Sequence, residues 1–136
     1  MSYDFSYFPP ADLKSADDFV PQIRLDFSEN AEPLNRTFGE CLVKYVDILG
    51  RKGCNRTALE FCKLVLAIDP TNDTFGTLLR IDYYAIRAKE FQFLCDFVEQ
   101  FAREIYYDKD NALHSSVLIL PNLLLTTALA KYNLQE

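Results

Sequence analysis

The chain is 136 residues long, and its residues are 49% hydrophobic and 14% aromatic, which supplies enough apolar surface for one folded core. Its formal net charge is −6, and most of that charge lies in residues 1–34, where seven carboxylates accompany only two cations. Residues 35–136 are therefore close to neutral and lack the basic stripe that a phosphate backbone requires. We expect no direct binding to DNA.

The four cysteines form no CxxC pair, and three of them fall among helical apolar residues. This usage is typical of buried thiols in a reducing compartment, and it predicts neither disulfides nor a metal site. The first ten residues lack the features of a secretory signal. The longest apolar run, residues 117–130, has 14 residues and contains Pro121, so it is too short to cross a bilayer. We predict a cytoplasmic or nuclear protein without a membrane segment.

Residues 1–34 contain four of the six prolines and show no sustained helical period, which predicts an extended, acidic segment. Within it Phe19, Ile23, Leu25 and Phe27 alternate with other residues as in a strand. Because no second run of this kind is available for pairing, we expect the stretch to pack as an extended segment on helices. A helical domain is predicted over residues 35–136.

Two helices begin this predicted domain. The first covers residues 35–50, and the second covers residues 55–68, with Asn55 as its N-cap and Asp69-Pro70 as its stop signal. The apolar positions of the first helix share one face, which we expect to be buried: Phe38, Cys41, Leu42, Tyr45, Val46 and Leu49.

Three further helices follow. The third starts after Asn72 or Asp73, runs to about residue 88 and is apolar on most sides, so it is expected between neighbours. The fourth covers residues 90–107, and a polar loop at 108–111 separates it from a fifth helix after Pro121. Because no partner helix follows it, we expect either that the chain is a piece of a longer solenoid or that the apolar face of the fifth helix meets another protein or a second copy of the chain. That face comprises Leu124, Leu125, Ala128, Leu129 and Tyr132.

The segment 50–72 carries the pattern of the second half of a tetratricopeptide repeat (TPR). A turn glycine at Gly53 precedes the small residue Ala58, and the segment closes with Ile68-Asp69-Pro70. The small residue lets two helices approach closely, and the proline ends the second one. The predicted fold is all-α, a TPR-like α-solenoid fragment of about five helices in antiparallel pairs, which functions by binding other proteins.

Four cations near the first turn are candidates for partner binding. Arg51, Lys52 and Arg56 flank Gly53, and Arg36 could join them in a small basic patch for an acidic partner, such as a ligase surface or ribosomal RNA. The alternative is that Arg51 and Lys52 only complement the carbonyl end of the first helix. Phe93 is a further candidate, because it falls opposite Leu94 and Phe97 on the fourth helix. It either fills the core between stacked repeats or lines a groove that binds a peptide.

No catalytic, cofactor-binding or metal site is predicted. Asp82 interrupts the apolar surface of the third helix, and we expect it to form a structural ion pair with Arg56, Arg80 or Arg87. His114 is expected in a solvated loop. No nucleophile is placed beside a base, and no glycine-rich phosphate loop occurs. We therefore predict that the chain is not an enzyme.

Five blocks of the sequence, in order, resemble the conserved region of the transcription factor 25 family. The resemblance extends from about Ile23 to Tyr132. The blocks are IRLDF from Ile23, LNRTF from Leu34, GRKGCNRTALEFCKLVLAIDP from Gly50, LLRIDYYAIRAKEFQFL from Leu78 and LPNLLLTTALAKY from Leu120.

The resemblance implies a helical scaffold without enzymatic activity that works beside the ubiquitin ligase Listerin on stalled large ribosomal subunits. There it would help direct ubiquitin onto unfinished polypeptides for degradation. Family members are longer than this chain, and residues 1–22 match no part of the pattern. The alternative is a nuclear module that recruits transcriptional partners, although no basic helix precedes an amphipathic helix pair as in basic helix-loop-helix proteins.

Overall fold

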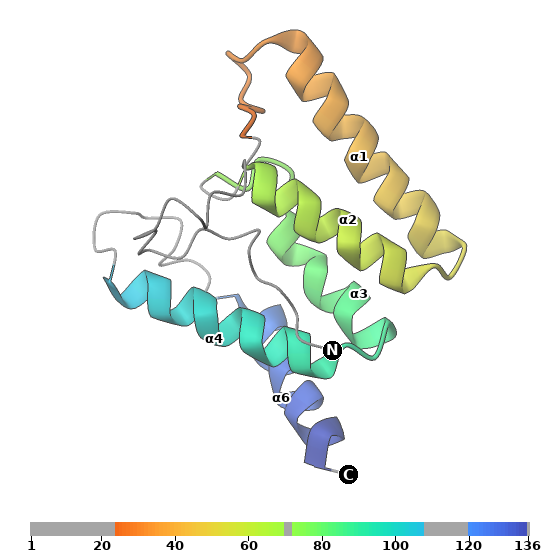
Figure 1. Cartoon of the computed structure of the whole chain (residues 1–136), viewed down its shortest axis with the longest axis vertical. Coiled ribbons are helices and arrows are strands. Elements are labelled where there is room, and N and C mark those ends of the chain that lie inside the picture. Colours follow the sequence, from red (N-terminus) through yellow and green to blue (C-terminus); the bar gives the residue numbers. More distant parts are fainter. Residues whose placement is uncertain (1–23, 70–71, 108–119, 136) are drawn as a thin grey trace, which may run out of the picture.

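The computed structural model describes residues 24–69, 72–107 and 120–135, with the backbone alone for 101–107. Within these ranges the chain contains five α-helices and no strand, which confirms the all-α prediction (Figure 1). The elements are α1 (Pro33–Arg51), α2 (Asn55–Ile68), the short 3-10 helix η3 (Thr77–Leu79), α3 (Ile81–Arg87), α4 (Phe91–Tyr107) and α6 (Pro121–Gln135).

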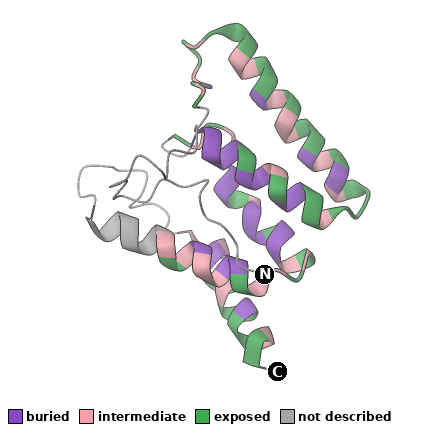
Figure 2. Ribbon diagram, viewed as in Figure 1, coloured by how far each residue is buried: buried purple, intermediate pink, exposed green. Residues whose placement is uncertain are grey.

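The helices pack in a series. α1 lies against α2, α2 against α3, and α3 against both α4 and α6, which also contact each other. α1 and α6 therefore lie at the two ends of the series and are more exposed than α2 and α3 (Figure 2). The fully buried side chains that form the centre include Leu59, Leu66, Ile81, Leu94, Phe97 and Leu123.

α1 buries only part of its apolar surface. Val46 and Leu49 face α2 and are buried, but Phe38, Cys41 and Tyr45 are exposed, so the prediction of one fully buried face is wrong. The physical reason is that α1 is an end helix, and α2 covers only one side of it.

The turn between α1 and α2 is closed by backbone hydrogen bonds. The Cys54 N–H donates to the Leu49 carbonyl (2.9 Å) and the Gly53 N–H to the Gly50 carbonyl (3.1 Å), which is a Schellman motif. Gly53 has a φ of +77°, in the left-handed region that favours glycine. The predicted cap is wrong: α2 begins at Asn55 itself, which makes no side-chain cap.

α3 is shorter than predicted, because the chain after α2 first forms a capped turn. Asp73 has a φ of +44°, and its carboxylate accepts hydrogen bonds from the N–H groups of Thr77 (2.7 Å) and Leu78 (3.0 Å). The prediction that Asn72 or Asp73 caps the third helix is wrong: Asp73 closes the turn before η3, whose N-cap is Gly76, and α3 starts only at Ile81 with Arg80 as its N-cap. The predicted end of α2 at Ile68 is confirmed, with Asp69 as C-cap.

α6 is attached through a narrow seam. Leu123 and Ala130, two turns apart, are buried, whereas all five residues of the predicted apolar face are exposed. Neither buried residue was singled out from the sequence. The predicted face is thus left without a cover among the described residues.

The described part of the extended segment before α1 begins at Arg24 and packs on the helices, as predicted for Leu25 and Phe27, whereas Phe19 and Ile23 lie outside the described residues. The Arg24 guanidinium donates to the Ala67 carbonyl (3.1 Å), and the Leu25 N–H approaches the Ile68 carbonyl (3.4 Å). Phe27 is fully buried, and its ring centroid lies 5.2 Å from that of Phe75. These contacts tie the segment to the carbonyl end of α2.

Candidate functional site

Arg51 and Lys52 project from the turn that joins α1 to α2. Both side chains are exposed, and neither forms an ion pair within the part of the chain that the structure describes. Arg51 is the last residue of α1 and Lys52 its C-cap, so both also lie at the negative end of the helix dipole. The Schellman motif fixes the backbone beneath them, and the two charges are therefore presented from a defined turn.

The other two predicted cations do not extend this patch. Arg56 is committed to Glu90, with Nη2 and Oε1 2.7 Å apart, so it links the start of α2 to the residue before α4. Arg36 pairs with Glu40 (3.3 Å) at the opposite end of α1. At 1.5 Å per residue it lies about 22 Å along the helix axis from Arg51. The expectation that Arg36 joins the patch is wrong.

Phe93 is not a groove residue. It is only 1% exposed, and its ring lies 5.6 Å from that of Phe97 on the same helix. The Lys63 ammonium of α2 sits 4.1 Å from the Phe93 ring centroid, a cation–π contact between α2 and α4. The prediction that Phe93 faces a partner is wrong. α3 and α6 both contact α4, and Lys63 of α2 covers the Phe93 ring, so more of the α4 surface is buried than its main apolar stripe.

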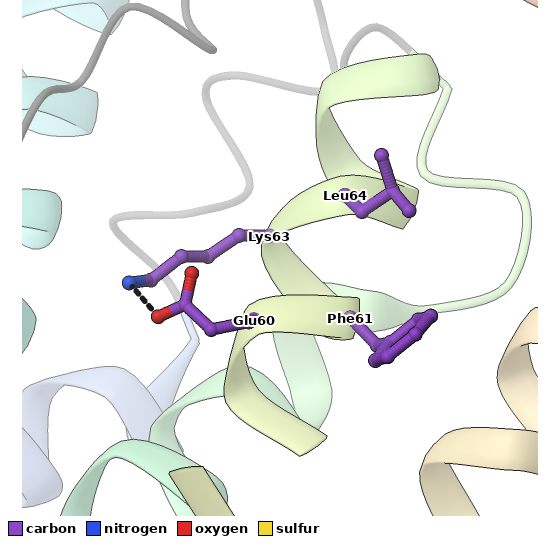
Figure 3. Close-up of a pocket in the computed structure, with 4 residues that line it drawn as sticks. All are labelled: Glu60, Phe61, Lys63 and Leu64. Atoms are coloured by element: carbon purple, nitrogen blue, oxygen red, sulfur yellow. Dashed lines mark hydrogen bonds and ion pairs between the residues drawn. The ribbon is translucent and has the colours of Figure 1, made fainter. Parts of the chain in front are cut away.

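Lys63 is a structural residue that sequence reasoning missed. It is 7% exposed, and its Nζ donates to Glu60 Oε1 at 2.7 Å (Figure 3). The spacing of three residues was a visible signal for this pair. Phe61 and Leu64 point away from the pair, and the four residues line an open pocket of about 210 Å³. Small-molecule sites usually occupy roughly 300–1,000 Å³, so this hollow does not indicate a substrate site.

Asp82 is buried, but the predicted ion pair is wrong. Each of the three proposed arginines is engaged elsewhere: Arg56 with Glu90, Arg80 with Asp47 (3.0 Å), and Arg87 with the Tyr83 ring (5.4 Å). The Asp82 carboxylate instead lies 3.2 Å from the Thr126 hydroxyl of α6. That hydroxyl also donates to the Asn122 carbonyl (2.7 Å), so a polar contact within hydrogen-bonding distance joins α3 to α6.

The described residues contain no cluster of three or more potential metal ligands. Burial raises the pKa of Cys62 to about 12 and also raises that of Cys95, which opposes formation of a reactive thiolate at either position. Cys41 and Cys54 are exposed. His114 lies outside the described residues. No helix in the described ranges is long and apolar enough to span a membrane.

Comparison with known proteins identifies the family. The sequence model of a family described as "Transcriptional repressor TCF25" matches residues 14–136. The human "Ribosome quality control complex subunit TCF25" is 34% identical over 113 residues, which cover 83% of this chain and 15% of the human protein.

Two fungal relatives match the chain at similar identity. The Schizosaccharomyces pombe "Ribosome quality control complex subunit 1" is 34% identical over 102 residues, or 75% of this chain and 14% of that protein. "Probable transcription factor claV" of Ampulloclitocybe clavipes is 37% identical over 98 residues, or 70% of this chain and 12% of its own length. No solved structure matches the chain. The chain thus spans about one seventh of the length of these relatives, and it belongs to the TCF25 family.

Proposed function

We propose that the chain is a non-catalytic scaffold of a ribosome quality control complex, acting in the cytoplasm or nucleus. The observation that carries the proposal is the 34% identity, over 83% of the chain, with a human protein named as a subunit of that complex. A series of helices with exposed surfaces at both ends, as in α1 and α6, supports a binding role. In this proposal residues 35–136 form a TPR-like α-solenoid fragment, which the acidic segment 1–34 precedes.

The proposed partners are a Listerin-type ubiquitin ligase, the large ribosomal subunit and ubiquitin. In this role the chain assists ubiquitination and degradation of stalled nascent polypeptides without carrying out chemistry itself. Arg51 and Lys52 provide the contact with an acidic partner surface, since they are exposed cations on a rigid turn. Arg56 supports the same turn through Glu90 and is not itself the contact.

The test is affinity purification of the tagged chain from cells that express a stalling reporter, scored for large-subunit proteins and the ligase. Recovery should rise with stalling, and it should fall for Arg51→Glu/Lys52→Glu. Arg87→Glu/Lys131→Glu is the matched control, because it makes the same change in net charge at α3 and α6. Recovery that ignores stalling would contradict the ribosomal role.

A second candidate function is transcriptional regulation through bound proteins. The family description and the claV relative both carry a transcriptional name, and this observation favours it. In that case the tagged chain should recover chromatin-associated proteins to the same extent with and without stalling. The two proposals therefore predict different results from one purification.

We also propose that the exposed face of α6 supports self-association. Leu125 is 71% exposed and Leu129 47%, and they lie on one side of the helix with Tyr132. Sedimentation equilibrium should show a concentration-dependent mass that the Leu125→Glu/Leu129→Glu variant lacks. A wild-type chain that is monomeric at every concentration would refute this proposal.

A further inference from the structure

An exposed apolar stripe runs the length of α1. Its spacing alternates between four and three residues, the heptad spacing of a helix that pairs with another helix. Its large side chains are well exposed, from 44% for Tyr45 to 76% for Leu34. We call this set the α1 stripe; it consists of Leu34, Phe38, Cys41, Tyr45 and Ile48.

The α1 stripe lies beside the α1–α2 interface, not within it. The residues that face α2, such as Val46 and Leu49, occupy the neighbouring arc and are buried. The two surfaces meet at Tyr45, whose ring makes an edge contact with Phe61 of α2 at 4.9 Å and 85°. Leu64, one turn further along α2, is 36% exposed. A helix that lies along the stripe would thus touch α1 along its length and α2 at its edge.

Charge is distributed unevenly around this stripe. Lys44 and Arg51 lie one heptad apart along the edge of the stripe that faces away from α2. Lys52, the C-cap of α1, adds a third cation just beyond them, and all three side chains are exposed. The carboxylates of α1 lie on the same flank as these cations, three or four residues from them, but each is already paired: Glu40 with Arg36, and Asp47 with Arg80. The border of the stripe is therefore cationic, although the whole chain has a net charge of −6.

We propose that the α1 stripe binds an amphipathic α-helix of a partner protein that carries apolar residues at heptad spacing and carboxylates along its flank. Apolar residues of the partner cover Phe38, Tyr45 and Ile48, and its carboxylates meet Lys44 and Arg51. From Leu34 to Ile48 the stripe rises about 21 Å, at 1.5 Å per residue, so a partner helix of about four turns covers it. The inference goes beyond the ribosomal role and does not depend on it.

A second copy of the chain fits this surface less well. Two α1 helices that paired antiparallel through the stripe would bring the flank of Lys44 and Arg51 against the same flank of the other copy. Like charges placed together in this way oppose association. An acidic partner removes that repulsion, and this charge complementarity decides between the two occupants.

The test uses the full chain and two synthetic three-heptad peptides, labelled for fluorescence anisotropy. Both carry leucine at the core positions, but one has glutamate at the flanking positions and the other lysine. The glutamate peptide should bind about ten-fold or more tightly than the lysine peptide at low salt. The Lys44→Glu/Arg51→Glu variant should reverse this preference, which a mere loss of folding cannot do.

The apolar half of the contact is tested with Phe38→Asp. It should abolish binding of the glutamate peptide, whereas Leu79→Asp, which changes an exposed leucine of η3, should leave binding unchanged. Circular dichroism checks that both variants remain helical. Equal binding of the two peptides, or binding that survives Phe38→Asp, would overturn the proposal. The proposal would also be overturned if an RNA oligonucleotide displaced the glutamate peptide from Lys44 and Arg51 and its own binding did not change in Phe38→Asp.

Two exposed thiols locate the contact within the same sample. Cys41 belongs to the α1 stripe, and Cys54 lies in the turn outside it. Saturating glutamate peptide should slow iodoacetamide modification of Cys41 by about ten-fold or more, as expected for a thiol that becomes buried, and leave Cys54 unchanged. Equal protection of both thiols would contradict the assigned position. A Cys41 that already reacts as slowly as buried Cys62 in the free chain would show the stripe to be covered, and it would also overturn the proposal.

Discussion

Two helices of this chain end in the same left-handed turn, but only one of the turns has glycine at the critical position. After α1 that position is Gly53, with a φ of +77°; after α3 it is Lys89, with a φ of +59°. The hydrogen bonds correspond as well: the Glu90 N–H donates to the Ala85 carbonyl (2.9 Å), as the Cys54 N–H does to the Leu49 carbonyl. Removing glycine at position 53 and introducing glycine at position 89 should therefore change the free energy of unfolding in opposite directions.

The magnitudes follow from the backbone. A β-carbon added to Gly53 would meet nothing within 4 Å, so Gly53→Ala is not opposed by a clash. A residue with a β-carbon in the left-handed region costs about 1–2 kcal/mol, and the lower entropy of the unfolded alanine chain offsets about 0.5–1 kcal/mol of it. Gly53→Ala should lower the free energy of unfolding by about 0.5–1 kcal/mol, and Lys89→Gly should raise it by a similar amount.

Urea unfolding followed by far-ultraviolet circular dichroism measures both effects. The double variant should return towards the wild-type midpoint, and any departure from the sum of the single effects measures the coupling that the Arg56–Glu90 ion pair creates between the two turns. Gly53→Asn is a further control, since asparagine tolerates the left-handed region better than alanine and should lose less stability. If both single substitutions shift the midpoint in the same direction, the turn-based reasoning is refuted.

Three further predictions concern the core. Leu123→Ala should cost about 2–5 kcal/mol in urea unfolding, because this side chain is 1% exposed, whereas Leu125→Ala should stay within about 0.5 kcal/mol. Thr126→Val removes a hydroxyl beside the buried Asp82 carboxylate and should cost about 1–3 kcal/mol; an unchanged midpoint would show that the contact contributes nothing. Burial raises the pKa of Cys62 from 9.0 to about 12, so stability should fall as pH rises from 9 towards 12, because the unfolded thiol ionises first. The matched Cys62→Ala chain should lack up to about 1.4 kcal/mol per pH unit of that slope.

The sequence predicted the helices better than their surroundings. Helix positions follow from apolar period and from stop signals, and the predicted end of α2 at Ile68 is confirmed for that reason. The third helix was predicted too long, because its apolar residues fit a helical period although Gly76 adopts a φ of +65° and precedes η3. A local backbone conformation of that kind is set by turn hydrogen bonds and leaves little trace in the apolar pattern.

The burial of particular faces depended on tertiary contacts. The apolar arc of α1 was recognised, but the sequence does not state that α2 covers only the side with Val46 and Leu49. In α4 more surface is buried than the apolar pattern indicates, because α3 and α6 both contact the helix and Lys63 covers Phe93. In the candidate site the exposed turn was predictable from Gly53 and its flanking charges, whereas the pairing of Arg56 with Glu90 required the third dimension.

We propose that this helical chain takes part in recognition of stalled ribosomes, and one binding experiment tests that role. The most direct measurement mixes the purified chain with purified large ribosomal subunits and follows its co-sedimentation through a sucrose cushion. The chain should co-sediment with subunits that carry a stalled nascent chain and a ligase, and little with empty subunits. Arg51→Glu/Lys52→Glu should reduce the co-sedimentation. A folded chain that stays in the supernatant with both, or that binds both equally, would contradict the claim.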